Sequence, residues 1–336
     1  MDVAPVKKRE NTSLFPFVLF VFAVGALLFL CLQPPSFLPF VSGLNNTPSP
    51  NYENVTVWTR INVTNAKPEI FPVVINEGLP LLPNITLRGG GIRNVLCNAT
   101  IRDWNGMDDN ITVNGSLYFA VAGYNASDDN NTHYTNASCI NVTPAYGQNG
   151  IYKNYTCGFD TLYYANAGVW NCTLAAYDIK DGKNYTVYGS NRTNFDRLFS
   201  LNVTDGIDYG DVAVGEFSNT AIANITNFGN SAINITVQGY GGVLNDGNAF
   251  VCNTSLSVFN ISVGNEAFTI NITNQNFTEK TALNGNLQNI TNLTMPKQTD
   301  PSVQIINSTA WQVYIPVSIN PNGVCTGNVI FAARQG

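Results

Sequence analysis

Residues 167–178 have the sequence AGVWNCTLAAYD and contain the clearest strand pattern in the chain. Apolar side chains occupy every second position from Trp170 to Ala176, with polar or small side chains between them. Successive side chains of a β-strand point to opposite faces of its sheet. We therefore expect a strand whose Cys172 points into a core, while the neighbouring Asn171 points outward.

A second stretch, residues 95–101, shows the same alternation with Cys97 on its apolar face. Two inward-facing cysteines at this separation suit a disulfide between the central strands of two packed sheets, which would pair Cys97 with Cys172. Cys139 and Cys157 would then form a disulfide that links adjacent strands. Spacing alone leaves crossed pairings of these four cysteines open.

The other cysteines agree with an exported chain. Cys252 and Cys325 are the only two in the C-terminal part, and we expect them to pair. Cys31 lies inside an apolar run, so six cysteines remain outside it, and an even number in an exported protein indicates disulfides. The sequence contains no CxxC motif, so nothing in it favours a zinc knuckle or thioredoxin-like chemistry.

The rest of the chain after residue 33 consists of short runs rich in Val, Ile, Thr, Tyr and Phe, broken by Asn-Gly, Asp-Gly and Gly-Gly turns. This pattern predicts an all-β fold of two β-sandwiches rather than an α/β fold. A weak repeat, INVTN at 61–65 and LNVTD at 201–205, marks the joints. We expect one sandwich at 54–204 and another at 205–336, with a single fused sheet as the alternative.

Residues 167–178, followed by Asp181 and Gly182, resemble the late strand and hairpin of immunoglobulin-like and PKD-like domains. Trp170 stands two residues before the second cysteine, where that family usually has tyrosine. The family's buried tryptophan on the third strand is missing, since residues 117–121 read LYFAV. The resemblance therefore implies the broader class of immunoglobulin-like sandwiches and not an antibody-type domain.

The second sandwich begins with IDYGDVAVG at 207–215, which leads into ITNFGNSAINI at 225–235. This opening resembles that of Hydin-type immunoglobulin-like domains, which share an aromatic-Gly start, a Val-Gly turn and an Asn-x-Gly hairpin. The whole composition is similar to that of archaeal exported surface glycoproteins, which are often Asn/Thr-rich stacks of immunoglobulin-like domains.

The N-terminus contains a run without charge at residues 14–32, LFPFVLFVFAVGALLFLCL. As a helix it would span about 28 Å, close to the thickness of the hydrocarbon core of a bilayer. Basic residues precede the run at 7–9, so the positive-inside rule predicts a cytoplasmic tail at 1–13, a transmembrane signal anchor at 14–33 and an exported remainder. A proline-rich stalk follows at 34–53. The alternative is a signal peptide cleaved near residues 41–43.

Asparagine is unusually frequent, with 48 in the chain, and 25 Asn-x-Ser/Thr sequons lie between Asn45 and Asn307. This is several times the number that the composition would give by chance. Charged residues make up only 11% of the chain, and dense N-glycosylation would explain both facts because glycans solubilise the surface. The simpler alternative is that Asn-Ile-Thr is itself a strand pattern. The candidate glycosylation sites are Asn54, Asn62, Asn84, Asn98, Asn110, Asn171, Asn184, Asn202, Asn224, Asn234, Asn271 and Asn289.

Two loops carry carboxylates that would lie at the same end of an immunoglobulin-like sandwich. Asp103 and Asp108 belong to the loop after the second strand, and Asp178 and Asp181 belong to the hairpin after the sixth. Their oxygens would converge on Ca²⁺, although Asp, Asn and Gly also simply favour turns. No other cofactor is expected.

Composition excludes several functions. The net charge of −6, with no basic block after the first ten residues, argues against nucleic acid as a partner. His133 is the single histidine, which disfavours most histidine-dependent catalysis. We expect a non-enzymatic, single-pass cell-membrane protein with its C-terminal domains outside, in a structural or adhesive role toward other surface proteins or glycans. The alternatives are a receptor or lectin-like module that uses the Asp103 and Asp178 loops and, more remotely, a secreted hydrolase.

Overall fold

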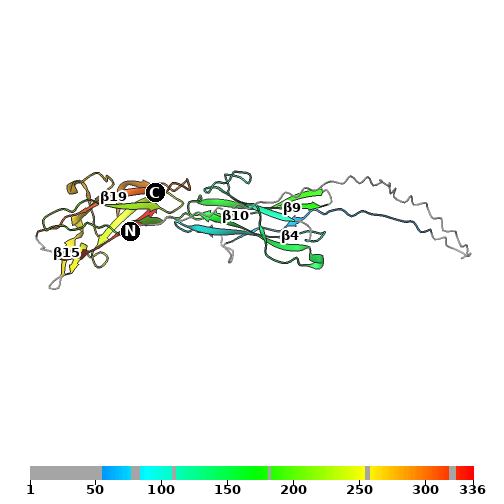
Figure 1. Cartoon of the computed structure of the whole chain (residues 1–336), viewed down its shortest axis with the longest axis horizontal. Helices are drawn as coiled ribbons and strands as arrows, with labels where there is room; N and C mark the ends of the chain where they lie inside the picture. Colours follow the sequence, from blue (N-terminus) through cyan, green and yellow to red (C-terminus); the bar gives the residue numbers. More distant parts are fainter. Residues whose placement is uncertain (1–54, 77–83, 108–110, 181–182, 254–257, 318–322) are drawn as a thin grey trace, which may run out of the picture. The chain divides into compact units, whose positions relative to one another are not determined.

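The computed structural model describes residues 55–76, 84–107, 111–180, 183–253, 258–317 and 323–336 (Figure 1). These residues form β-strands and three short 3₁₀ turns and contain no α-helix, which confirms the all-β prediction. None of the described residues belongs to a helix that could cross a bilayer. The expected cytoplasmic tail, membrane anchor and stalk at 1–53 lie outside this described part of the chain.

Two facing sheets form the first sandwich. One has the order β1-β4-β8-β7, with β2 also paired to β4, and the other has the order β3-β10-β9-β5-β6. The strands of the first sheet are β1 (Glu69–Ile70), β2 (Val74–Asn76), β4 (Ile92–Arg102), β7 (Ile140–Asn141) and β8 (Tyr152–Leu162). Those of the second are β3 (Asn84–Ile85), β5 (Thr112–Phe119), β6 (His133–Asn136), β9 (Gly168–Lys180) and β10 (Lys183–Phe195).

All pairs in this sandwich are antiparallel except β3, which runs parallel to β10 at the edge of its sheet. This order of strands is that of an immunoglobulin-like sandwich. The expected late strand and hairpin are β9 and β10, which pair along their whole length (Figure 1). A turn, η1 (Gln148–Gly150), precedes β8.

Trp170 on β9 occupies the centre of this core and is fully buried. Its ring stacks on Phe195 with the ring centroids 4.6 Å apart. The indole Nε1 donates a hydrogen bond to the backbone oxygen of Asn166 at 2.7 Å. The corner tyrosine of immunoglobulin domains makes a similar bond to backbone a few residues upstream, so Trp170 takes over its packing and its polar contact.

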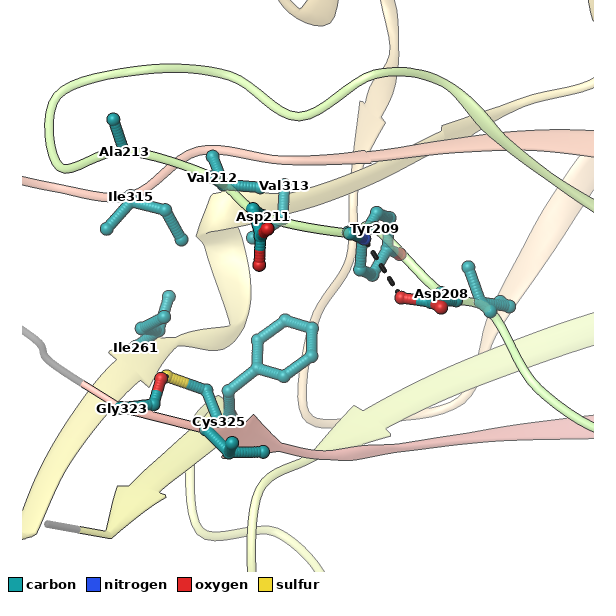
Figure 2. Close-up of a pocket in the computed structure, with 14 residues that line it drawn as sticks. Asp208, Tyr209, Asp211, Val212, Ala213, Ile261, Val313, Ile315, Gly323 and Cys325 are labelled. Carbon is teal, nitrogen blue, oxygen red and sulfur yellow. Dashed lines mark hydrogen bonds between the residues drawn. The ribbon is translucent and has the colours of Figure 1, made fainter.

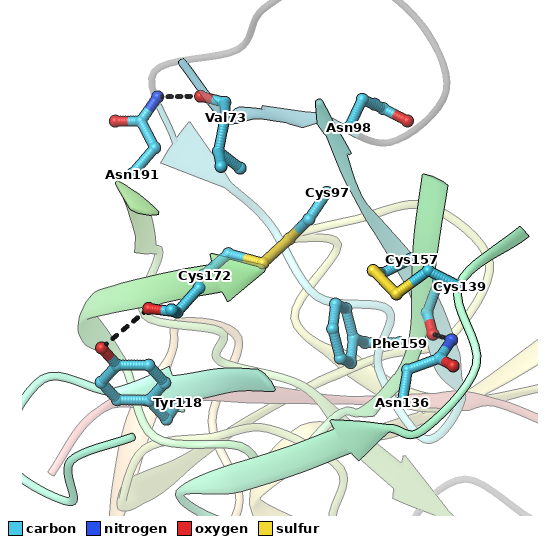
Figure 3. Close-up of a disulfide and its surroundings, with 12 residues drawn as sticks. Val73, Cys97, Asn98, Tyr118, Asn136, Cys139, Cys157, Phe159, Cys172 and Asn191 are labelled. Atoms are coloured by element: carbon cyan, nitrogen blue, oxygen red, sulfur yellow. Dashed lines mark hydrogen bonds between the residues drawn. A yellow bond between two sulfur atoms is a disulfide. The ribbon is translucent and has the colours of Figure 1, made fainter. Parts of the chain in front are cut away.

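Two disulfides lie in the same core (Figure 3). Cys97 on β4 is bonded to Cys172 on β9 across the two sheets, and Cys139 is bonded to Cys157 on β8. Cys97 and Cys157 face each other in the β4–β8 register. Gly115 on β5 lies against Cys157, because an added Cβ would come within 2.9 Å of the sulfur of that cysteine. The pairing between sheets follows the predicted alternation, and the crossed pairings do not occur.

Residues from 201 onward form the other sheets. One has the order β11-β12-β19-β16-β17, and two smaller ones have the orders β18-β13-β21 and β15-β14-β20. The strands are β11 (Leu201–Val203), β12 (Ala221–Asn227), β13 (Ile233–Tyr240), β14 (Asn248–Asn253), β15 (Val258–Ser262), β16 (Glu266–Thr269), β17 (Thr281–Ala282), β18 (Gln288–Met295), β19 (Ile306–Val313), β20 (Cys325–Thr326) and β21 (Asn328–Gln335), with turns η2 (Val263–Asn265) and η3 (Phe277–Glu279).

The core of these sheets is separate from that of the first sandwich. Trp311 on β19 is fully buried in it, and Cys252 on β14 is bonded to Cys325 on β20, as the sequence predicts. Since β11 pairs with β12, Leu201–Val203 belongs with this second group of sheets, a few residues before the expected boundary at 204.

Candidate functional site

The structure brings Asp103 and Asp178, two of the four predicted metal ligands, to one end of the first sandwich. Asp103 directly follows β4, and Asp178 lies near the end of β9. Each stands an even number of positions beyond its bridged cysteine, Cys97 or Cys172, and therefore points inward as the cysteine does. Both aspartates are fully buried. The other two predicted ligands, Asp108 and Asp181, lie outside the described residues.

A third segment, residues 65–66, connects these two loops. Asn65 is 4% exposed, and its Nδ2 donates a hydrogen bond to Oδ2 of Asp178 at 2.7 Å. The backbone N–H of Ala66 donates to Oδ1 of Asn105, whose own N–H donates to Oδ1 of Asp103 at 3.0 Å. Asn65 was not expected from the sequence, because its place outside a sequon is shared with its neighbours Asn51 and Asn76.

Two oxygen atoms of this cluster are buried without a hydrogen-bond partner among the described residues. They are Oδ1 of Asp178 and Oδ1 of Asn65. Buried polar atoms are almost always paired with protein or water, so these two atoms indicate that something else completes the site. No group of three or more His, Cys, Asp and Glu side chains that could hold a metal ion occurs in the described residues, and this cluster is two carboxylates and an amide.

The outer surface beside Asp103 is aromatic and basic. Trp104 is 58% exposed, and the guanidinium carbon of Arg102 lies 4.3 Å from the centre of its ring. Arg102 also forms an ion pair with Glu69, to which the indole of Trp104 donates at 3.3 Å. A hydrogen bond with Tyr152 and the pairing with Glu69 raise the pKa of Arg102 above its already high value.

The second group of sheets has an open groove of 820 Å³ (Figure 2). Ile261, Val313 and Ile315 form an apolar wall, and Asp208 and Asp211 come from the segment that covers it. Both aspartates are exposed. The Oδ1 of Asp208 accepts the N–H of the residue two positions on, which is the usual behaviour of aspartate in a turn. These side chains therefore do not form an arrangement typical of a catalytic or binding site.

Glu266 and Tyr209 form a strongly perturbed titratable pair in the second group of sheets. Glu266 is 2% exposed, and the Tyr209 hydroxyl donates to its Oε1 at 2.6 Å. Burial raises the pKa of Glu266 to about 7 and raises that of Tyr209 well above its usual value. Glycoside hydrolysis needs two carboxylates. The other carboxylate of this neighbourhood in the described residues, Asp205, is exposed, so we interpret the pair as structural.

The Glu266 pair predicts a specific dependence of stability on pH. The folded state binds the proton more tightly than the unfolded state, whose pKa is near 4.5, so stability is greatest below that value and falls as the pH rises through 7. The loss reaches about 3 kcal/mol. Glu266→Gln keeps an acceptor for Tyr209 and should remove the dependence. Denaturant unfolding of both proteins from pH 4.5 to 8 measures it, and parallel curves would contradict the assignment.

The polar run DDNNT at 128–132 predicts a solvated loop with an exposed His133, and this prediction is wrong. His133 begins β6 and is 2% exposed. Its Nδ1 lies 2.8 Å from Oδ1 of Asp128, and its Nε2 lies 3.0 Å from the backbone oxygen of Tyr124. Both ring nitrogens are therefore used to fix the preceding loop to the sheet.

The sequon asparagines are the largest set of candidate sites. The structure describes 22 of the 25, all except Asn45, Asn54 and Asn110, and none of the 22 is buried. Four described asparagines are buried, and every one of them lies outside a sequon: Asn65, Asn131, Asn227 and Asn230. Asparagines in sequons and asparagines that serve the core are thus separate groups.

Comparisons with known proteins give no family for the chain. No protein-family model and no curated protein matches it. Solved structures that match include a chaperone–tip adhesin complex of Csu pili of Acinetobacter baumannii, at 11% identity over 74% of this chain and 96% of that one, with a TM-score of 0.35. Another is the C-terminal domain of the AgI/II polypeptide BspA of Streptococcus agalactiae, at 10% identity over 80% and 96%, with a TM-score of 0.23.

A chaperone–tip adhesin complex of CFA/I fimbriae also matches, at 12% identity over 79% of this chain and 84% of that one, with a TM-score of 0.29. At these scores the similarity carries no argument about function. The class of the protein follows from its own geometry. The strand order, the disulfide between the sheets and the bonded Trp170 define the first sandwich as an immunoglobulin-like domain.

Proposed function

We propose that this protein is an exported N-glycoprotein, held in the cell membrane by its N-terminal apolar run, with a structural or adhesive role at the cell surface. Its immunoglobulin-like sheets lie outside the cell, and its partners are other surface proteins or glycans rather than nucleic acid. The protein is not an enzyme in this proposal.

The distribution of asparagines carries the proposal. Transfer of a glycan requires that the asparagine side chain be accessible, and none of the described sequon asparagines is buried. A strand pattern alone would also turn these asparagines outward, so the number of sequons, several times that expected from the composition, is what favours glycosylation. Asn227, which is fully buried and donates to the backbone oxygen of Pro296 at 2.9 Å, lies outside any sequon.

The three disulfides support export as well. Disulfides persist in oxidising compartments and are rare in the cytosol. All six cysteines outside the apolar run are paired: Cys97 with Cys172, Cys139 with Cys157, and Cys252 with Cys325.

Peptide mapping of the protein from its native membrane tests the proposal. We expect glycans on the exposed asparagines of regular strands and their ends, such as Asn84, Asn202, Asn224 and Asn289. Non-sequon Asn94, which is also exposed on a strand, is the matched control and should be bare. Bare sequons throughout would overturn the proposal.

A further inference from the structure

We propose that Asn65, Asp103 and Asp178 form a Ca²⁺ site at the end of the first sandwich. The proposal is independent of glycosylation and membrane anchoring. To the Asp103 and Asp178 loops expected from the sequence it adds a third ligand, Asn65, from a separate segment. All three residues belong to the described part of the chain.

The first argument is the burial of charge. Asp178 has no exposed surface, and Asn65 Nδ2 supplies a hydrogen bond to only one of its two carboxylate oxygens. The other oxygen has no hydrogen bond among the described residues, and no described cation forms an ion pair with Asp178. Buried carboxylates are normally paired with a cation or coordinate a metal. A divalent cation at the free oxygen would meet this need.

The second argument comes from Asn65, which carries no charge. Its amide nitrogen bonds Asp178, so its Oδ1 lies next to that carboxylate, and this atom is also buried and unpartnered among the described residues. The amide oxygen of Asn65 therefore lacks a hydrogen-bond donor, as the free carboxylate oxygen of Asp178 does. One water molecule or one cation at this point would satisfy both atoms, and the uncompensated charge of the buried Asp178 carboxylate favours the cation.

The third argument places Asp103 in the same site. Asn65 bonds Asp178, and the next residue, Ala66, bonds the Asn105 side chain, which belongs to the turn closed by Asp103. Asp103 and Asp178 also point into the space between the same two sheets, which Cys97–Cys172 bridges. Asp103 thus adds a second carboxylate to the proposed site.

The chemistry of the ligands favours Ca²⁺. All three side chains offer oxygen, which excludes the nitrogen and sulfur sets that Zn²⁺ prefers. Ca²⁺ accepts six to eight oxygens in flexible geometry and completes its shell with backbone carbonyls and water, whereas Mg²⁺ demands a near-ideal octahedron. Among the lysines of these segments, Lys153 donates to the backbone oxygen of Met107 at 2.7 Å, and Lys183 donates to the hydroxyl of Thr64 at 3.1 Å.

Calorimetric titration of the full-length, oxidised chain with CaCl₂ tests the site. We expect one site with a dissociation constant on the order of 0.1–1 mM, in the range of extracellular calcium modules. Asp178→Asn should weaken binding by roughly 100-fold or more, while Asn65→Asp, which adds a charge, should tighten it. Terbium luminescence sensitised by Trp104, next to Asp103 in the chain, gives a second reading of the same site.

Asp160→Asn is the matched control, because it removes one carboxylate charge from an exposed position on β8 of the same sandwich. It should bind Ca²⁺ like the unaltered chain. Equal affinity of Asp178→Asn and Asp160→Asn would overturn the proposal, as would the absence of any calcium heat in the unaltered chain. If Asp178→Asn does not fold, two variants of Asn65 test the site instead. Asn65→Ala must weaken Ca²⁺ binding and Asn65→Asp must strengthen it. Equal affinities of these two variants would overturn the site.

Discussion

Replacing Cys97 and Cys172 together by alanine should lower the free energy of unfolding by about 4–5 kcal/mol. The bond closes a sequence separation of 75 residues, and removing it frees that loop in the unfolded chain. Both cysteines are fully buried between the sheets, so the variant also loses packing there. Denaturant unfolding of the two proteins, monitored by tryptophan fluorescence, measures the difference.

The second disulfide provides the control for this prediction. Cys139→Ala with Cys157→Ala opens a separation of only 18 residues, so the expected loss is smaller, about 3 kcal/mol. A greater loss from this pair than from Cys97 and Cys172 would mean that the bond between the sheets is not the main covalent support of the first sandwich.

Replacing Trp311 by alanine should cost about 3–5 kcal/mol. The side chain is fully buried and packs between Phe268 and Phe331, with ring centroids 5.2 and 5.5 Å away. Its Nε1 also donates to the Thr309 hydroxyl at 2.8 Å, which would be left without this buried donor. The unfolding transition of the second group of sheets should therefore shift to markedly lower denaturant.

Trp104→Ala is the matched control, because the same atoms are removed from a residue that is 58% exposed. Its loss should stay within about 1 kcal/mol, the value of an exposed contact between a cation and an aromatic ring. Equal losses at Trp104 and Trp311 would contradict the description of the second core.

The strand alternation made much of the first sandwich predictable. It placed Cys97, Cys172 and Trp170 on inward faces, and a disulfide between sheets follows from two such strands. The short runs broken by polar turns also predicted strands rather than helices after the apolar run. Local pattern is sufficient for these features because each depends on neighbours along one strand.

The rest depends on contacts between distant segments, which no local pattern contains. Asn65 has no strand around it, and its partner Asp178 is 113 positions away. His133 lies among polar residues typical of a loop, yet Asp128 and Tyr124 fold back onto both of its nitrogens. The pKa of Glu266 is raised because the fold buries it, and its hydrogen-bond partner Tyr209 is 57 positions away. Sequence could suggest the aspartate loops but not the residue that connects them.

Non-reducing peptide mapping by mass spectrometry, on protein taken from its native membrane, tests the central claim most directly. One experiment reads the glycans, the three disulfides and the mature N-terminus. We expect glycans on many sequons, the pairs Cys97–Cys172, Cys139–Cys157 and Cys252–Cys325, and intact peptides from residues 1–13. Bare asparagines together with free thiols would contradict an exported surface glycoprotein, and a new N-terminus near Leu44 would contradict its anchoring in the membrane.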